Sequence, residues 1–157
     1  MLIKVLSNND FNKMCVERGI DDSNVEMLEN DAFISIIGTT DDSYDMPGFH
    51  HFMENHPNVL NLEFDDVEND INIGGYSFKA ITNEQADKLV QFIIENKGKN
   101  FYIHCLAGIS RSGAVGSFIY DFFNDECEIE FEHRPKLRPN IEVLSKLKKS
   151  YWYKNFK

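Results

Sequence analysis

The chemistry and the fold of this chain centre on one stretch, Ile103-His104-Cys105-Leu106-Ala107-Gly108-Ile109-Ser110-Arg111-Ser112-Gly113. An apolar run typical of a β-strand leads into it, and a helical pattern leads out of it. The stretch is therefore expected to be a loop between a strand and the N-terminus of a helix. Backbone N–H groups in such a loop can point inward and, with the helix dipole, form a site for an anion.

The residue types in this loop suit phosphate chemistry. At the floor of the anion site, the pKa of the Cys105 thiol would be lowered, so that a thiolate forms. Arg111 can grip two phosphate oxygens with its planar fork, and Ser112 can donate its hydroxyl to the sulfur. We expect His104 to hydrogen-bond the backbone beside Cys105 and to fix the loop. A buried core thiol is the usual fate of cysteine, but it would leave Gly108, Arg111 and Ser112 unexplained. The residues expected to bind substrate are Leu106, Ala107, Gly108, Ile109, Ser110, Arg111 and Ser112.

The rest of the chain alternates strand and helix patterns. Strands are expected at residues 3–6, 32–37, 59–64 and 101–104, and helices at 8–18, 82–97, 111–124 and 140–151. Residues 38–58 and 126–138 are expected to be a loop and an exposed charged segment. This order predicts an α/β fold for residues 1–157 as a single domain, with a mostly parallel central sheet of about four to five strands flanked by helices.

Composition narrows the classes of partner. The 157 residues are 42% hydrophobic, which fits one domain with a real core. The formal charge of −10 argues against nucleic acid and against an anionic membrane surface as partners. No apolar run is long enough to span a bilayer, and the apolar N-terminal run is too short for a signal peptide. The three widely spaced cysteines do not form a disulfide framework, so a cytoplasmic location is expected.

The stretch around Cys105 resembles the signature of a known protein family. His104 to Ser112 reads His-Cys-x-Ala-Gly-x-Ser-Arg-Ser and resembles the signature of the cysteine-based protein tyrosine phosphatases, in its dual-specificity branch. The chain is most similar to a group of small prokaryotic predicted tyrosine phosphatases. Those carry a Leu-x-Phe-x-Asp segment, which Leu62 to Asp66 resembles, and a Pro-Asn helix start, which Pro139-Asn140 resembles.

The resemblance implies a tyrosine-phosphatase-like fold and a two-step hydrolysis through a phosphocysteine, without metal or cofactor. It implies a general acid upstream of Cys105, and Asp65 and Asp66 both lie in that window. The alternation of Leu60, Leu62 and Phe64 continues to Asp66, which we favour, with Asp65 as the alternative and Asp70 as an outside candidate. Asn140 and His104 are expected to support the site.

The substrates implied are phosphotyrosine proteins or peptides, with phosphoserine and phosphothreonine as an extension. Phosphoinositide and RNA 5′-phosphatases are the rivals within the superfamily. A non-catalytic phosphate-binding module, a pseudophosphatase, is the main rival outside it, followed by sulfur transfer or arsenate reduction at the cysteine.

Two further clusters of charged or titratable residues stand out in the sequence. His50, His51 and His56 match no zinc spacing, so we expect packed or solvated loop histidines. Residues 132–138 form a basic island, which is either a solvated loop or a positive lip that offsets the repulsion between an acidic protein and a phosphate.

Overall fold

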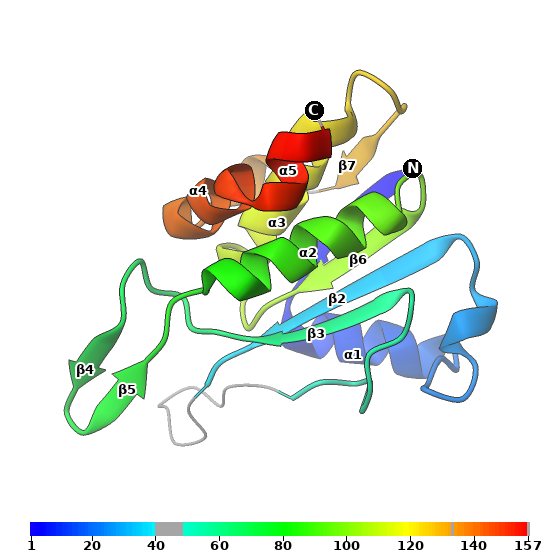
Figure 1. Ribbon diagram of the computed structural model, residues 1–157. Coiled ribbons are helices and arrows are strands. Elements are labelled where there is room, and N and C mark those ends of the chain that lie inside the picture. The colour runs from blue at the N-terminus through cyan, green and yellow to red at the C-terminus, as the bar shows by residue number, and fades with distance from the viewer. Residues whose placement is uncertain (40–48, 133, 157) are drawn as a thin grey trace.

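The computed structural model describes residues 1–39, 49–132 and 134–156, and its centre is a five-stranded sheet between helices (Figure 1). The strands lie in the order β3-β2-β6-β1-β7, and each neighbouring pair is parallel. Their bounds are Leu2–Leu6 (β1), Asp31–Ile37 (β2), Val59–Glu63 (β3), Asn100–His104 (β6) and Glu130–Glu132 (β7). The predicted α/β class with a parallel central sheet is confirmed.

Helices cover the two faces of the sheet unequally (Figure 1). On one face lies α1 (Asn8–Glu17), and on the other lie α2 (Asn83–Glu95) and α3 (Arg111–Phe123). Outside these two pack α4 (Ile141–Lys149) and α5 (Tyr151–Phe156). Short 3₁₀ turns occur at Val25–Met27 and Arg134–Lys136.

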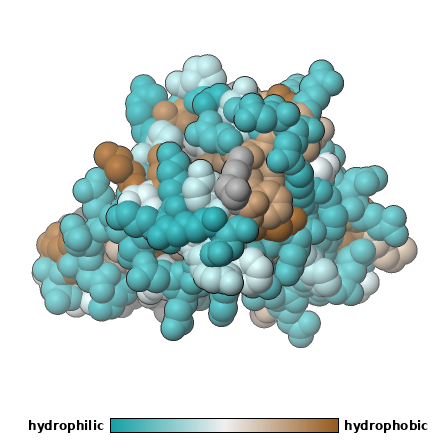
Figure 2. All heavy atoms as spheres, turned by 45° about the horizontal axis from the view of Figure 1, so that its top comes forward, coloured by the Kyte–Doolittle hydropathy of each residue, from teal (hydrophilic) through white to brown (hydrophobic). Residues whose placement is uncertain are grey.

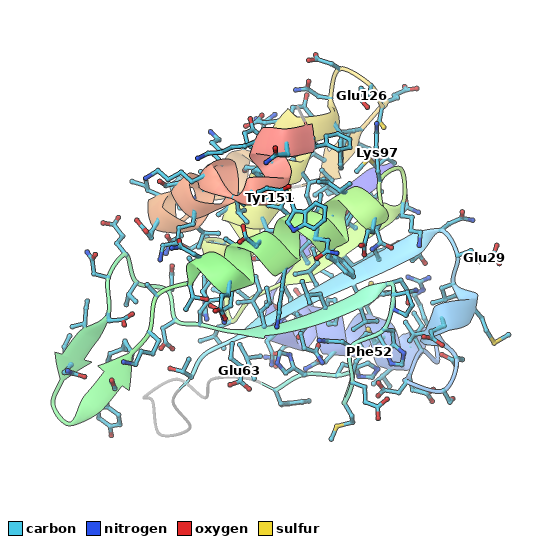
Figure 3. All side chains as sticks on the ribbon, in the orientation of Figure 1. Glu29, Phe52, Glu63, Lys97, Glu126 and Tyr151 are labelled. Atoms are coloured by element: carbon cyan, nitrogen blue, oxygen red, sulfur yellow. The ribbon has the colours of Figure 1, made fainter. Side chains whose placement is uncertain are left out.

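Strand β2 has apolar neighbours on both sides, which is why its sequence is a continuous apolar run. Phe33 packs beneath α1, with its ring centroid 6.1 Å from that of Phe11 and 5.5 Å from that of Phe52, which Figure 3 labels. Ala32, Ile34 and Ile36 point the other way, into the larger core under α2 and α3. Strand β2 is thus buried on both faces of the sheet.

Local signals set the helix starts as predicted. Thr82 caps α2, and its side chain and that of Gln85 form the reciprocal bonds of a capping box. Asn140 caps α4 in the same manner, with its side-chain oxygen accepting from the N–H of Val143 at 3.1 Å.

Three elements differ from the sequence-based expectation. Residues around Gly74 and Gly75 form an antiparallel hairpin of β4 (Ile71–Ile73) and β5 (Tyr76–Phe78) that projects away from the main sheet (Figure 1). Strand β7 arises inside the charged segment 126–138 and pairs with β1 at the sheet edge. Strands of three residues are too short to show a period of two. The C-terminal helix is also divided, because Ser150 is extended, with φ −63° and ψ 151°.

The C-terminal aromatic residues only partly join the core. Tyr153 packs against Phe118 and Phe122, with ring centroids 5.5 and 5.2 Å away, whereas the neighbouring Tyr151 is 63% exposed. Lys97 and Glu126, both labelled in Figure 3, form an ion pair that joins the end of α2 to the segment after α3.

Polar side chains cover most of one face of the molecule (Figure 2). Figure 2 shows hydrophilic residues over most of one face, with apolar residues in small separate patches. Within residues 1–39, 49–132 and 134–156, no helix combines the length and the apolar character that crossing a membrane needs.

Candidate active site

Cys105 directly follows β6, the central strand of the sheet. After the neighbouring β1 the chain turns to α1 on one face, whereas after β6 it turns to α3 on the other (Figure 1). Parallel sheets open a crevice at such a point, outside the carboxyl ends of their strands. The loop of residues 105–110 lies there, at the N-terminus of α3.

The carbonyl groups of this loop are held outward by backbone N–H donors from two neighbouring segments. The bonds join Asn8 to Leu106 at 3.1 Å, Arg138 to Ile109 at 3.2 Å and Asn140 to Ser110 at 3.0 Å. Gly108 has φ +72°, and an added Cβ there would lie 2.4 Å from the carbonyl carbon of Leu6. The N–H groups of Ile109 and Ser112 face the thiol of Cys105, as donors do in an anion nest.

The thiol of Cys105 lies at the bottom of this nest and is 2% exposed. Its Sγ is 3.0 Å from the Oγ of Ser112. Burial is the largest single influence on its pKa and would raise it. The Ser112 hydroxyl, the charge of Arg111 and the N–H groups of Ser112 and Ile109 together outweigh burial and hold the pKa of Cys105 below 9.0. The site therefore makes the thiol of Cys105 more acidic than an ordinary cysteine.

Arg111 begins α3, and its side chain is buried beside the thiol, with 7% of the residue exposed. One terminal nitrogen, Nη1, donates to the carbonyl of Phe64 at 2.9 Å, which fixes the direction of the guanidinium. Within the described residues, the buried Nε–H has no acceptor. A buried donor without a partner is costly, and an anion bound in the loop would supply the missing acceptor.

The two candidate acids diverge. Asp66 is exposed, and its Oδ1 accepts hydrogen bonds from Ser110 Oγ and Asn140 Nδ2, both at 2.8 Å. These bonds tie Asp66 to the loop that holds Cys105. Strand β3 ends at Glu63, so the alternation through Leu60 and Leu62 does not itself reach Asp66. The contacts with Ser110 and Asn140 set its position.

Asp65 points away from the loop and binds groups of the segments after β2 and before α2. It is buried, and its carboxylate accepts from the N–H and hydroxyl of Thr39 and from the N–H of Lys79 at 2.7 Å. Asp70 similarly accepts from the N–H of Ala80 at 2.9 Å. Both carboxylates therefore stabilise the segment between β3 and α2.

His104 links the start of the loop to strand β2. It is fully buried, and its Nδ1 lies 3.3 Å from the carbonyl oxygen of Cys105. Its Nε2 lies 2.6 Å from the hydroxyl of Ser35. Burial lowers the pKa of His104 to about 4, so the ring is neutral at neutral pH. Sequence reasoning missed Ser35, whose signal is a single hydroxyl within the apolar run of β2.

A depression of about 570 Å³ opens beside the candidate acid. Its walls combine polar groups of the site with apolar side chains from the β4 region and the start of α4, and the lining includes Asp66, Ser110, Asn140, Val67, Ile71 and Ile141. The loop, the candidate acid and this depression are thus contiguous.

The basic island divides into two parts. Arg134 faces away from the loop, 3.8 Å from Asp121 and with its guanidinium 4.2 Å from the ring centroid of Tyr120. Lys136 lines a smaller depression with Ala107, Gly108 and Ile109, and Arg138 binds the loop through its backbone N–H. His133 lies outside the described residues. Lys136 and Arg138 are exposed next to the loop, and this placement agrees with a positive lip.

The histidines of the loop before β3 each have their own partner. His56 lies 2.8 Å from Asp22, His51 lies 2.6 Å from the carbonyl of Ile20, and His50 contacts Ser35. In the described ranges, no three His, Cys, Asp or Glu side chains are placed to hold a metal ion. Residues 40–48 of the expected loop, with Pro47 and Gly48, lie outside the described part of the chain.

The other two cysteines differ from Cys105. Cys15 is fully buried on the apolar face of α1, and burial raises the pKa of its thiol to about 12. Cys127 is half-buried, and all three cysteines are free thiols.

Comparison with known proteins identifies no relative. No protein-family model matches the chain, and neither a curated protein nor a solved structure matches it.

Proposed function

We propose that this protein is a phosphomonoester hydrolase that acts on phosphotyrosine proteins through a phosphocysteine intermediate. The observation that carries the proposal is the arrangement around Cys105. A thiol with a depressed pKa lies 3.0 Å from a hydroxyl, and beside it lies an arginine whose buried Nε–H has no acceptor in the described residues. A phosphate dianion would satisfy that donor together with the loop N–H groups.

In the first step the Cys105 thiolate attacks phosphorus, and the bond from phosphorus to the leaving oxygen breaks. Arg111 and the loop N–H groups stabilise the negative charge on the equatorial oxygens of the transition state. Asp66, protonated, gives its proton to the leaving oxygen. Its Oδ1 is occupied by Ser110 and Asn140, so Oδ2 is the oxygen that carries this proton.

In the second step water attacks the phosphocysteine and the bond from sulfur to phosphorus breaks. Asp66 takes the proton of the water, which restores the acid for the next cycle. The hydroxyl of Ser112 donates to the departing sulfur and stabilises the thiolate that forms. Inorganic phosphate leaves, and no external reductant or oxidant is needed.

Three features favour a phosphotyrosine protein over the other phosphate esters. The variable positions of the loop, Leu106 to Ser110, carry no lysine that would bind the extra phosphates of an inositol headgroup. The net charge of −10 opposes RNA. The depression beside Asp66 offers Val67, Ile71 and Ile141 to an apolar part of a peptide. Phosphoserine and phosphothreonine proteins belong to the same proposal as an extension, and we place the enzyme in the cytoplasm.

Hydrolysis of para-nitrophenyl phosphate, with vanadate as inhibitor, is the primary test. Cys105→Ser should abolish turnover, and Cys127→Ser is the matched control that should retain it. Turnover that survives in Cys105→Ser refutes the proposal. A wild-type protein that binds inorganic phosphate without any turnover is a pseudophosphatase. A panel of phosphotyrosine, phosphoserine and phosphothreonine peptides, a phosphoinositide and a 5′-triphosphate RNA then ranks the substrates.

The acid is tested by Asp66→Asn against Asp65→Asn. Asp66→Asn keeps an oxygen for Ser110 and Asn140 but removes the proton, so we expect about a 10²–10⁴-fold loss on a substrate with a poor leaving group. Activity on a good leaving group should fall far less. Asp65→Asn should instead lower stability, because its new amide N–H₂ would face the N–H of Lys79 or Thr39. If Asp65→Asn shows the leaving-group effect and Asp66→Asn does not, the assignment is reversed.

A further inference from the structure

A chain of hydrogen bonds extends the site beyond His104. The hydroxyl of Ser35 lies 2.6 Å from Nε2 of His104 and also 2.6 Å from Nδ1 of His50. Ser35 is fully buried on β2, and His50 lies in the half-buried segment that precedes β3. Strand β2 and the segment before β3 are thus linked to His104, the residue that precedes Cys105.

The donors and acceptors available allow only one direction of donation along this series of hydrogen bonds. The carbonyl of Cys105 can only accept, so Nδ1 of His104 carries the hydrogen of the 3.3 Å contact. A neutral ring then has no hydrogen on Nε2, which must accept from Ser35. Because a serine hydroxyl has a single proton, Ser35 must in turn accept from Nδ1–H of His50. Each member is satisfied only if His50 supplies the first donor.

We propose that His50 is a positioning residue which, through Ser35 and His104, holds the carbonyl of Cys105 and so orients the thiol and the loop N–H groups. The inference rests on the proposed function only in taking Cys105 as the reacting thiol. Without His50 the Ser35 oxygen loses the donor that His50 supplies, and the remaining bond from Ser35 to His104 is weakened, because the bonds of a buried hydrogen-bonded chain polarise one another. Ser112 contacts the sulfur directly, and the charge of Arg111 also lowers the pKa of the thiol, so the expected effect of losing His50 is partial.

The test measures the thiol itself rather than turnover. Iodoacetamide alkylation of Cys105, followed by mass spectrometry across pH, reports the fraction of thiolate. His50→Leu removes the donor at similar volume and should lower the alkylation rate below neutral pH by about two- to tenfold, the factor carried by one neutral hydrogen bond. His50→Asn places an amide N–H₂ near the position of Nδ1 and should restore the rate. His51→Asn, next in the chain and bonded to Ile20, is the control that should leave it unchanged.

A double-mutant cycle decides whether His50 acts through Ser35. Ser35→Ala should slow alkylation by itself, and adding His50→Leu to it should cause no further loss. Losses that multiply in the double variant, or an unchanged rate in His50→Leu, overturn the inference. Protection of Cys15 from alkylation verifies that each variant is folded, since Cys15 is fully buried. If the wild type fails to hydrolyse phosphate esters while the cycle behaves as stated, the proposed function fails and the positioning role stands.

Discussion

Gly108→Ala is the most informative single substitution in the loop. Gly108 has φ +72°, where an L-residue costs about 1–2 kcal/mol. The added Cβ would lie 2.4 Å from the carbonyl carbon of Leu6, 2.5 Å from the nitrogen of Ser7 and 2.6 Å from the carbonyl oxygen of Leu6. These are backbone atoms at the junction of β1 and α1, and they cannot rotate away as a side chain can.

The magnitude follows from these contacts. Carbon atoms pack at about 3.5–4.0 Å, so either the loop or the β1–α1 junction must shift by about 1 Å. Overpacking of this kind costs about 1–3 kcal/mol, which with the backbone strain gives a destabilisation of about 2–5 kcal/mol. A displacement of about 1 Å at a reacting group can lower a rate about 100-fold. We therefore expect a less stable protein whose thiol pKa rises and whose turnover falls by about two orders of magnitude.

Gly74→Ala is the matched control. Gly74 also has positive φ, +56°, but no heavy atom lies within 4 Å of an added Cβ. It should cost about 1–2 kcal/mol of backbone strain and leave alkylation of Cys105 unchanged. Urea unfolding measures stability, and iodoacetamide alkylation across pH measures the thiol. If Gly108→Ala matches Gly74→Ala in both measurements, close packing of the loop on β1 does not hold the thiol in place, and the reasoning is refuted.

Three more predictions concern the scaffold. Gly116→Ala should destabilise the protein by about 1–3 kcal/mol, because the added Cβ would lie 2.8 Å from the side chain of Val5. Gly113→Ala in the same helix meets only ordinary contacts with Leu137, so its stability should be unchanged or rise by up to about 1 kcal/mol. Equal urea midpoints for the two variants would contradict this. Arg18→Ala should lower stability by about 1–2 kcal/mol, because it leaves the buried Asp31 carboxylate without its 2.8 Å partner. Lys13→Ala, which breaks an exposed ion pair, should lower stability by at most about 0.5 kcal/mol. A larger loss of stability in Lys13→Ala than in Arg18→Ala would refute the comparison. The hydrogen bond to Asp22 raises the pKa of His56 above 6.5, so the stability that this pair contributes is fully present below pH 6.5 and is lost as pH rises through the raised pKa. The free energy of unfolding of His56→Gln, measured in urea, should not show this loss. A wild-type stability that rises relative to His56→Gln over that pH range would contradict the prediction.

Much of the fold was accessible from local patterns. The capping box of Thr82 and Gln85 and the apolar run of β2 involve residues close in sequence, so their physical signals lie within a few positions of one another. The hairpin β4–β5 and the edge strand β7 gave no such signal. Their residues are largely polar or exposed, and β7 exists because it pairs with β1 from the other end of the chain.

The loop from Cys105 to Ser112 was likewise readable in advance. A cysteine and an arginine at this spacing, between a strand and a helix start, predict an anion site built from the backbone itself. By contrast, adjacent aspartates cannot be told apart by a sequence pattern. Asp65 turns to Thr39 and Lys79 while Asp66 turns to Ser110 and Asn140, and each choice depends on residues tens of positions away.

The sequence by itself determined the α/β class, the parallel sheet and the location of the loop, because these follow from periodicity, capping and a contiguous motif. Only the tertiary structure decided which carboxylate faces the loop, which lysine and arginine border it, and that Ser35 and His50 lie beneath it. Those relations join β2, β6 and the segments before β3 and α4, and hydrogen bonds between such distant segments form only once the strands have been laid side by side.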